Sequence, residues 1–207
     1  MVEMREHEAR QKLLLDELNH RVKNTLAVVQ SMAAQTFRST PDLLAARDAF
    51  TERLMALSAT HNILVDRAWE GAELHALLTT SLKPYGRPFS YAGVDLALDA
   101  NLAVSLGMAI HELATNALKH GAWRGEGSVA VEVSEVDDSQ VQIVWREYGG
   151  PAVSAPQRRG FGMRLLNTGV AGEFNGRVTL DFAPTGLVCT ICVPCSHQLR
   201  VIPMEPT

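Results

Sequence analysis

The chain has 207 residues, 46% of them hydrophobic, and a formal net charge of −4 at pH 7. This length accommodates one ordinary domain plus a smaller helical unit, and the hydrophobic content excludes a disordered or fibrous protein. The slight acidity and the lack of a long basic cluster give no reason to expect nucleic-acid binding. Because no apolar run reaches membrane-spanning length and no signal peptide opens the chain, we expect a cytoplasmic location.

Two amphipathic helices are predicted at the N-terminus. Residues 3–37 lack glycine and proline, and their apolar side chains recur every three or four positions, which predicts a seam for a partner helix. Thr40 and Pro41 are predicted as the N-cap and first residue of a second helix. The two apolar columns are Leu15, Leu18, Val22, Leu26, Val29 and Ala33 in the first helix, and Leu43, Phe50, Leu54, Leu57 and Leu64 in the second. They predict an antiparallel hairpin over residues 1–66, and two hairpins would form a four-helix bundle in a homodimer.

His20 lies in the first predicted helix, two residues from both Leu18 and Val22. Helical geometry therefore directs it away from the apolar seam. An exposed imidazole with a carboxylate neighbour such as Asp16 can keep a nucleophilic nitrogen near physiological pH. On periodicity alone, an ordinary surface histidine is the simpler interpretation.

A linker is predicted over residues 65–72, followed by a second domain over residues 67–195 and a flexible tail over 196–207. The elements expected in the second domain are a short helix over 73–82, strands over 89–91 and 94–98, a helix over about 101–119, a hairpin of strands 128–136 and 140–148, a helix over about 162–174, and strands over 177–182 and 186–193. Helices grouped against a mainly antiparallel sheet predict an α+β sandwich.

The three cysteines, Cys189, Cys192 and Cys195, lie at the end of the last predicted strand. Their spacing resembles a metal motif, but there is no fourth thiolate and the nearest histidine is His197, so we expect no metal there. The alternation of Leu187, Cys189, Ile191 and Val193 instead predicts one buried face of a strand.

The helix predicted over 101–119 carries an apolar and a polar side. The apolar positions are Leu102, Leu106, Ile110, Leu113 and Leu118. Glu112, Asn116 and Lys119 recur at i, i+4 and i+7 on another side. Carboxylate and carboxamide oxygens can face Mg2+ while an ammonium faces phosphate, so this column suits a magnesium-bound polyphosphate. The alternative is a solvated helix face.

Two glycine-containing stretches follow. Glu147 ends a predicted strand, and Gly149 and Gly150 permit a tight turn with close backbone approach to a ligand, although an ordinary loop fits them too. Gly160 and Gly162 precede a predicted helix N-terminus, where free N–H groups and the helix dipole favour phosphate.

The eight residues 152–159 are predicted as a short lid over the nucleotide. Arg158 or Arg159 would either reach its phosphates or remain solvated.

These stretches together resemble a known family. HELATNALKHG, with Glu112 and Asn116 one turn apart, resembles the N-box of the GHKL ATP-binding fold, which gyrase-type ATPases and sensor histidine kinases share. His111 directly before Glu112, and the W-x-E of Trp145 and Glu147, resemble more narrowly the HWE group of histidine kinases. The resemblance covers nearly the whole chain and implies the same α+β layout.

The resemblance implies a Mg-ATP site. Asn116 and Glu112 would hold Mg2+, Lys119 and the turn of Gly160 and Gly162 would bind phosphate oxygens, and Glu147 would accept from the adenine amino group. The roles of His111 and Trp145 stay open: an aromatic in a strand usually belongs to the core, and His111 can support Glu112 through a hydrogen bond.

The stretch H-R-V-K-N, beginning at His20, resembles the phosphoacceptor box of the same group. The resemblance implies that His20 takes phosphate and passes it to an aspartate in the receiver domain of a response regulator. Arg21 follows the acceptor where the wider group commonly has an acid, and arginine cannot accept a proton. The base is therefore Asp16, Glu17 or Glu112, with all three open.

Two alternatives belong to other classes. A non-catalytic phosphotransfer or scaffold protein would keep the hairpin with a degenerate ATP domain, and ATP binding distinguishes it. A GHKL enzyme that hydrolyses ATP or phosphorylates Ser/Thr would give no acid-labile phosphoprotein.

Overall fold

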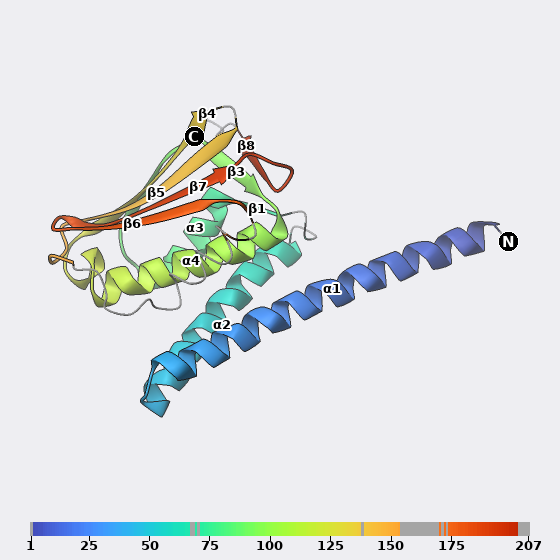
Figure 1. The fold of residues 1–207 in the computed structure, drawn as a ribbon, viewed down its shortest axis with the longest axis horizontal. Coiled ribbons are helices and arrows are strands. Elements are labelled where there is room, and N and C mark those ends of the chain that lie inside the picture. Colours follow the sequence, from blue (N-terminus) through green and yellow to red (C-terminus); the bar gives the residue numbers. More distant parts are fainter. Residues whose placement is uncertain are drawn as a thin grey trace. The chain divides into compact units, whose positions relative to one another are not determined.

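The computed structural model describes residues 2–66, 69, 71–137, 139–153, 170, 172 and 174–202, with the backbone alone for residues 2–11, 13–18, 20 and 21. The chain divides into two compact units, Met1–Leu54 and Met55–Thr207. Figure 1 shows the helical N-terminal part in blue and cyan and the sheet-rich part in green to red.

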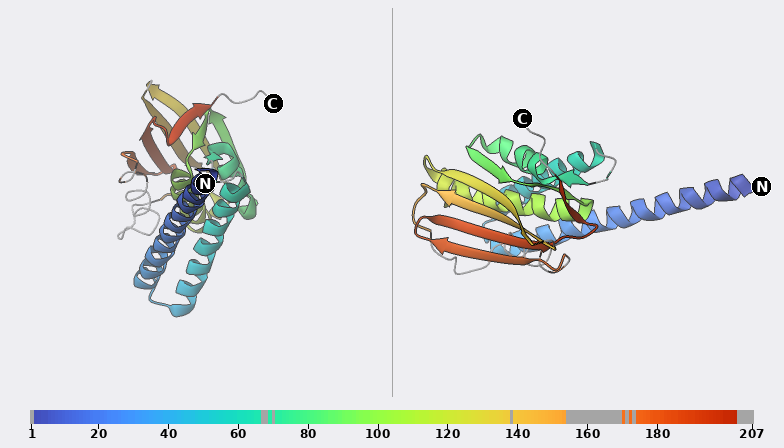
Figure 2. Two further views of the ribbon diagram at one scale, coloured as in Figure 1. Left: turned by 90° about the vertical axis from the view of Figure 1, so that its right-hand side faces the viewer. Right: turned by 90° about the horizontal axis from the view of Figure 1, so that it is seen from above.

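The first unit consists of α1 (Val2–Ser39) and the first part of α2 (Leu43–Asp66). The long predicted helix is confirmed. The two helices contact each other near their connection, where the Phe37 and Phe50 rings lie 6.2 Å apart and Arg53 donates to Thr36 Oγ1 at 2.7 Å. They therefore form the predicted antiparallel hairpin close to the turn, as Figure 2 shows.

The second helix begins later than predicted. Asp42 Oδ1 accepts from the Ala45 N–H at 2.7 Å, so Asp42 is the N-cap. The Thr40 N–H still bonds to the Thr36 carbonyl at 3.1 Å and belongs to the end of α1. The prediction that Thr40 caps the helix and Pro41 begins it is therefore wrong.

Apolar side chains stay exposed along the hairpin. The following residues of the first unit are between 41% and 71% exposed: Val22, Leu26, Phe37, Leu43, Leu44 and Leu54. Farther along α2, in the second unit, Leu57 and Leu64 are buried, and Leu64 joins the core of that unit. The predicted apolar column of the second helix is thus largely exposed in the first unit and buried in the second.

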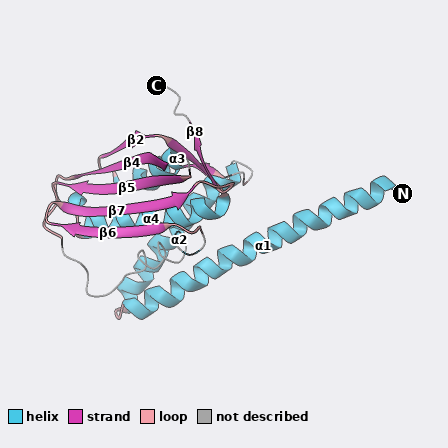
Figure 3. Ribbon diagram, turned by 45° about the horizontal axis from the view of Figure 1, so that its top comes forward, coloured by secondary structure: helices cyan, strands magenta, loops and turns pink. Residues whose placement is uncertain are grey.

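The second unit is built on a five-stranded sheet (Figure 3). Its strands in spatial order are β2 (Phe89–Gly93), β4 (Ser128–Asp137), β5 (Gln140–Tyr148), β7 (Gly186–Pro194) and β6 (Arg177–Ala183). β2 runs parallel to β4, and the other neighbours are antiparallel. With its helices on one side, this sheet confirms the predicted α+β class.

A smaller antiparallel sheet joins β1 (Ala72–Glu73), β3 (Asp95–Leu98) and β8 (Leu199–Ile202). β8 corrects the prediction of a flexible tail over 196–207, because residues 199–202 complete this sheet and Leu199 is fully buried. Residues 203–207 lie outside the described part of the chain. The predicted linker over 65–72 is likewise shorter, since α2 continues to Asp66 and β1 begins at Ala72.

The helices of this unit are α3 (Leu74–Leu82), α4 (Ala100–Lys119) and two short 3-10 turns, η1 (Lys83–Tyr85) and η2 (Ala122–Arg124). Asp99 caps α4, because its carboxylate accepts from the Leu102 N–H at 2.8 Å. α4 lies along one face of the five-stranded sheet in Figures 1 and 3. Its C-terminal end thereby reaches the end of β5.

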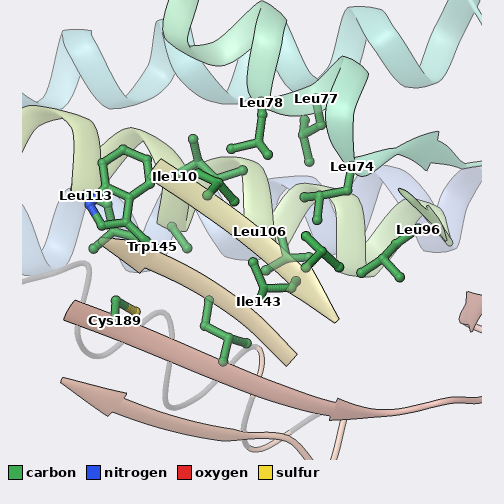
Figure 4. Close-up of a cluster of buried hydrophobic side chains, with 14 of the residues drawn as sticks. Leu74, Leu77, Leu78, Leu96, Leu106, Ile110, Leu113, Ile143, Trp145 and Cys189 are labelled. Atoms are coloured by element: carbon green, nitrogen blue, oxygen red, sulfur yellow. The ribbon is translucent and has the colours of Figure 1, made fainter. Parts of the chain in front are cut away.

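The core lies between α4, α3 and the sheet (Figure 4). Its members include the following side chains, each at most 5% exposed: Leu74, Leu77, Leu106, Ile110, Leu113, Ile143, Trp145 and Cys189. The predicted alternation in the last strand is confirmed, and burial raises the pKa of the Cys189 thiol to about 12. Leu118, predicted in the apolar stripe of α4, is instead 36% exposed because it lies near the helix end.

None of the helices within the described residues is long and apolar enough to cross a membrane.

Candidate active site

The polar column of α4 is divided between buried and exposed positions. Glu112 is 8% exposed, whereas Asn116 and Lys119, one and two turns farther on, lie at the surface. In these last turns Ala114 and Ala117 keep one side of α4 in the core, whereas Asn116 and Lys119 lie on the side that the core does not cover. The column therefore leads from a desolvated carboxylate to an amide and an ammonium that a solute can reach.

The end of α4 is held by the backbone of Asn116. Its carbonyl accepts from the His120 N–H at 2.8 Å and from the Gly121 N–H at 3.1 Å. These bonds satisfy a carbonyl that the helix end would leave without an intrahelical partner. They also turn the chain into η2, where the Ala122 N–H points away from the helix.

That N–H meets Glu147, at the end of β5. Glu147 is 3% exposed; its Oε2 accepts from the Ala122 N–H at 2.8 Å and its Oε1 from the Trp145 indole N–H at 3.4 Å. A Cβ atom at Gly121 would overlap with this carboxylate, so the helix end and the acid touch without intervening atoms. Two residues 25 positions apart in the sequence, Ala122 and Glu147, are thus brought together.

The two glycines after β5 make a close approach, although to the protein's own backbone. Gly149 has a φ of +70°, which favours glycine, and a Cβ atom at Gly150 would lie 2.7 Å from the backbone nitrogen of Ala122. The turn therefore packs on η2 beside Glu147. The predicted tight turn is confirmed, and its glycines are explained without a ligand.

Burial raises the pKa of Glu147, against the lowering effect of the Ala122 and Trp145 hydrogen bonds. A carboxylate with a raised folded-state pKa stabilises the fold fully below its unfolded pKa, and this contribution is lost as pH rises through the folded pKa. We expect Glu147→Gln, which stays neutral, to gain stability relative to wild type as the pH rises through that window. Urea unfolding at several pH values measures the difference.

The matched control is Glu132→Gln, on an exposed position of β4. Its difference from wild type gives the baseline for replacing an exposed glutamate. A Glu147→Gln difference that changes with pH no more than this baseline would contradict the raised pKa of Glu147.

An aromatic cluster beside the site contains residues that the sequence did not single out. The Tyr85 hydroxyl and His111 Nδ1 lie 2.7 Å apart, and the Tyr85 ring lies 5.9 Å from Trp123. Trp123 in turn contacts Trp145 edge-on at 5.9 Å. Trp145 itself lies in the core, as is usual for an aromatic residue in a strand. No local signal in the sequence linked Tyr85 to His111.

The residues present fit Mg-ATP. Magnesium commonly uses one or two protein oxygens together with substrate phosphates, and α4 offers the Glu112 and Asn116 side chains. No cluster of three or more His, Cys, Asp or Glu side chains that could hold a metal occurs among the residues the structure describes. The Glu147 carboxylate has four lone-pair sites and accepts from the Ala122 N–H and the Trp145 indole, which leaves room for an amine.

Several predicted site residues fall outside the described part of the chain. These are Gly160 and Gly162, the arginines Arg158 and Arg159, and most of the helix predicted over 162–174. The backbone of α1 includes His20, but its side chain is not among those described. The predictions for these residues stay predictions.

Comparison with known proteins shows which class of protein has this architecture. The chain superimposes on the blue-light activated histidine kinase EL346 of Erythrobacter litoralis with a TM-score of 0.62 at 20% identity, over 88% of this chain and 61% of that one. The histidine kinase domain of the same protein gives 0.56 at 20% identity, over 83% and 97%. The chain thus has the fold of these histidine kinase structures.

Sequence similarity is more specific. Residues 17–95 match the model of the HWE histidine kinase family. The blue-light-activated histidine kinases of Brucella anthropi and Brucella ovis are 38% and 36% identical to the chain, over 96% of this chain and 42% of each relative. Along its whole length the chain is therefore similar to HWE histidine kinases, and it spans less than half the length of these relatives.

Proposed function

We propose that this chain is an ATP-dependent protein-histidine kinase that phosphorylates its own His20 and passes the phosphoryl group to an aspartate of a response-regulator receiver domain. The contact of Glu147 with Ala122 and Gly121 carries the proposal. It joins the end of the α4 column to a buried acid near the end of β5, the central strand of the sheet. The adenine and the triphosphate of ATP need an acceptor and a phosphate-binding group at opposite ends of one site, and Glu147 and the α4 column would supply them.

Each residue has a part in binding. The Glu147 carboxylate accepts from the adenine amino group, and Lys119 binds phosphate oxygens together with the backbone N–H groups of Gly160 and Gly162. Asn116 and Glu112 would hold Mg2+ through their side-chain oxygens. The ion, when bound, neutralises charge on the β and γ phosphates.

His20 is the nucleophile in this proposal. A ring nitrogen attacks the γ phosphorus in line, the bond to the bridging oxygen breaks, and ADP leaves. The proton on the other ring nitrogen passes to a carboxylate, either Asp16, Glu17 or Glu112. The receiver aspartate then attacks the phosphorus and releases His20.

The hairpin supplies the partner surfaces. In this proposal residues 1–66 form the dimerisation and phosphoacceptor region, and residues 67–195 form the catalytic domain. The exposed apolar side chains of α1 and α2, such as Leu26 and Leu43, support pairing of two hairpins in a homodimer. ATP as the donor agrees with a cytoplasmic location.

Asn116→Ala tests the nucleotide site by calorimetry with Mg-ATP. The variant removes an oxygen that faces the ion, and we expect the affinity to fall about 10- to 100-fold. Asn116 is exposed, so its side chain contributes little to the fold.

Asn101→Ala is the control, because Asn101 is also an exposed asparagine but lies in the first turn of the same helix. It should bind like wild type. Unchanged affinity in Asn116→Ala would refute the assignment of α4, and no Mg-ATP binding by the wild-type chain would favour a phosphotransfer or scaffold protein.

A further inference from the structure

The orientation of the Trp145 ring is fixed without help from Glu147. Trp145 is 3% exposed and packs edge-on against Trp123, with ring centroids 5.9 Å apart and an interplanar angle of 72°. Trp123 is fully buried, and its indole N–H donates to the Pro88 carbonyl at 3.1 Å. Two locked rings therefore determine the direction of the Trp145 N–H.

That N–H is directed at one oxygen of Glu147, while a backbone group holds the other. The Trp145 indole contacts Oε1 at 3.4 Å, and the Ala122 N–H contacts Oε2 at 2.8 Å. The indole contact is longer than a typical N–H···O bond and contributes direction more than strength. Donors from two elements, one at each oxygen, set the plane of the carboxylate and the directions of its remaining lone pairs.

An ionised carboxylate only accepts hydrogen bonds, so its orientation selects the partner. Adenine has an amino group where hypoxanthine and guanine have a carbonyl oxygen. A buried acceptor rejects that oxygen because both groups would remain unpaired.

We propose that Trp145 is a positioning residue for base selectivity: its indole N–H aims the Glu147 carboxylate at the adenine amino group and so favours ATP over inosine and guanosine triphosphates. The inference rests on the proposed function, in which Glu147 reads adenine. It gives Trp145 a role in addition to its place in the core.

Binding of Mg-ATP and Mg-ITP to the full chain tests the inference. Wild type should prefer ATP by about tenfold or more, the value of one hydrogen bond to a charged group. Trp145→Phe keeps a packed ring and removes the N–H, so the preference should shrink at least about threefold, mainly through weaker ATP binding.

Trp123→Phe is the matched control. It removes the same atoms from the Trp123 ring. The N–H that is lost donates to the Pro88 carbonyl in wild type and not to Glu147. Because Trp123 also helps to fix the Trp145 ring, the preference of this variant for ATP should shrink less than that of Trp145→Phe, which loses the N–H itself. If wild type binds both nucleotides equally, the adenine role of Glu147 in the proposed function fails. If wild type is selective and Trp145→Phe is equally selective, the positioning role alone is overturned.

A second measurement decides the matter if Trp145→Phe does not fold. In wild type labelled with ¹⁵N-tryptophan, the Trp145 indole resonance should follow the titration of Glu147, and this response should vanish in Glu147→Gln. The neighbouring titratable groups, Tyr85 and His111, contact each other. A Trp145 resonance that ignores the protonation of Glu147 would overturn the inference.

Discussion

Replacing His20 by alanine should abolish transfer of phosphate from ATP labelled on its γ phosphate, down to the level without enzyme. The physical reason is that the methyl side chain of alanine has no nucleophilic nitrogen. The variant should still bind Mg-ATP as wild type does, because His20 is not among the binding residues. The assay is incorporation of label, followed by acid treatment, which removes phosphate from histidine but not from serine or threonine.

His197→Ala is the control for this experiment. His197 is exposed in the turn before β8, and its loss should leave labelling unchanged. Full labelling of His20→Ala would remove the acceptor assignment. Label that survives acid would favour a GHKL enzyme that phosphorylates Ser/Thr.

Gly121→Ala should weaken Mg-ATP binding by at least about tenfold, because it displaces the Glu147 carboxylate from its proposed hydrogen bond to the adenine amino group. The added methyl group would overlap with the Glu147 carboxylate and lie 3.0 Å from the Ala117 Cα atom. Either the acid or the turn must move, and such overpacking typically costs about 1–3 kcal/mol in the free energy of unfolding. Calorimetry and urea unfolding measure the two effects.

Gly125→Ala gives a matched control three residues after Ala122. Gly121 has φ −111° and ψ −145°, and Gly125 has φ −122° and ψ −140°, so the two glycines have similar backbone conformations. A Cβ atom at Gly125 would meet nothing within 4 Å. This variant should bind Mg-ATP normally, and equal behaviour of the two variants would show that contact with Glu147 is unimportant.

Periodicity predicted most of the fold because burial follows it closely. The α4 stripe and the alternation through Cys189 are both present in the core. The cap at Asp42 and the strand at 199–202 were missed for different reasons. Competing cap residues stand side by side at 40–42, and β8 gains its stability from pairing with β3, far away in the sequence.

The candidate site was predictable in its residue types but not in its contacts. Glu112, Asn116 and Glu147 follow from spacing and resemblance. The Ala122 N–H is a backbone group, which no side-chain pattern reveals, and the proximity of Gly121 to Glu147 depends on the way α4 crosses the sheet. Tyr85 and Trp123 are likewise joined to the site only by tertiary packing.

A crystal structure of the chain with magnesium and a non-hydrolysable ATP analogue tests the central claim most directly. The decisive quantity is the distance from the adenine amino nitrogen to the Glu147 carboxylate, together with the position of the ion relative to Asn116. We predict a hydrogen-bonding distance at Glu147 and the ion beside the Asn116 oxygen. A nucleotide bound elsewhere, with Glu147 and Asn116 facing no part of it, would contradict the account.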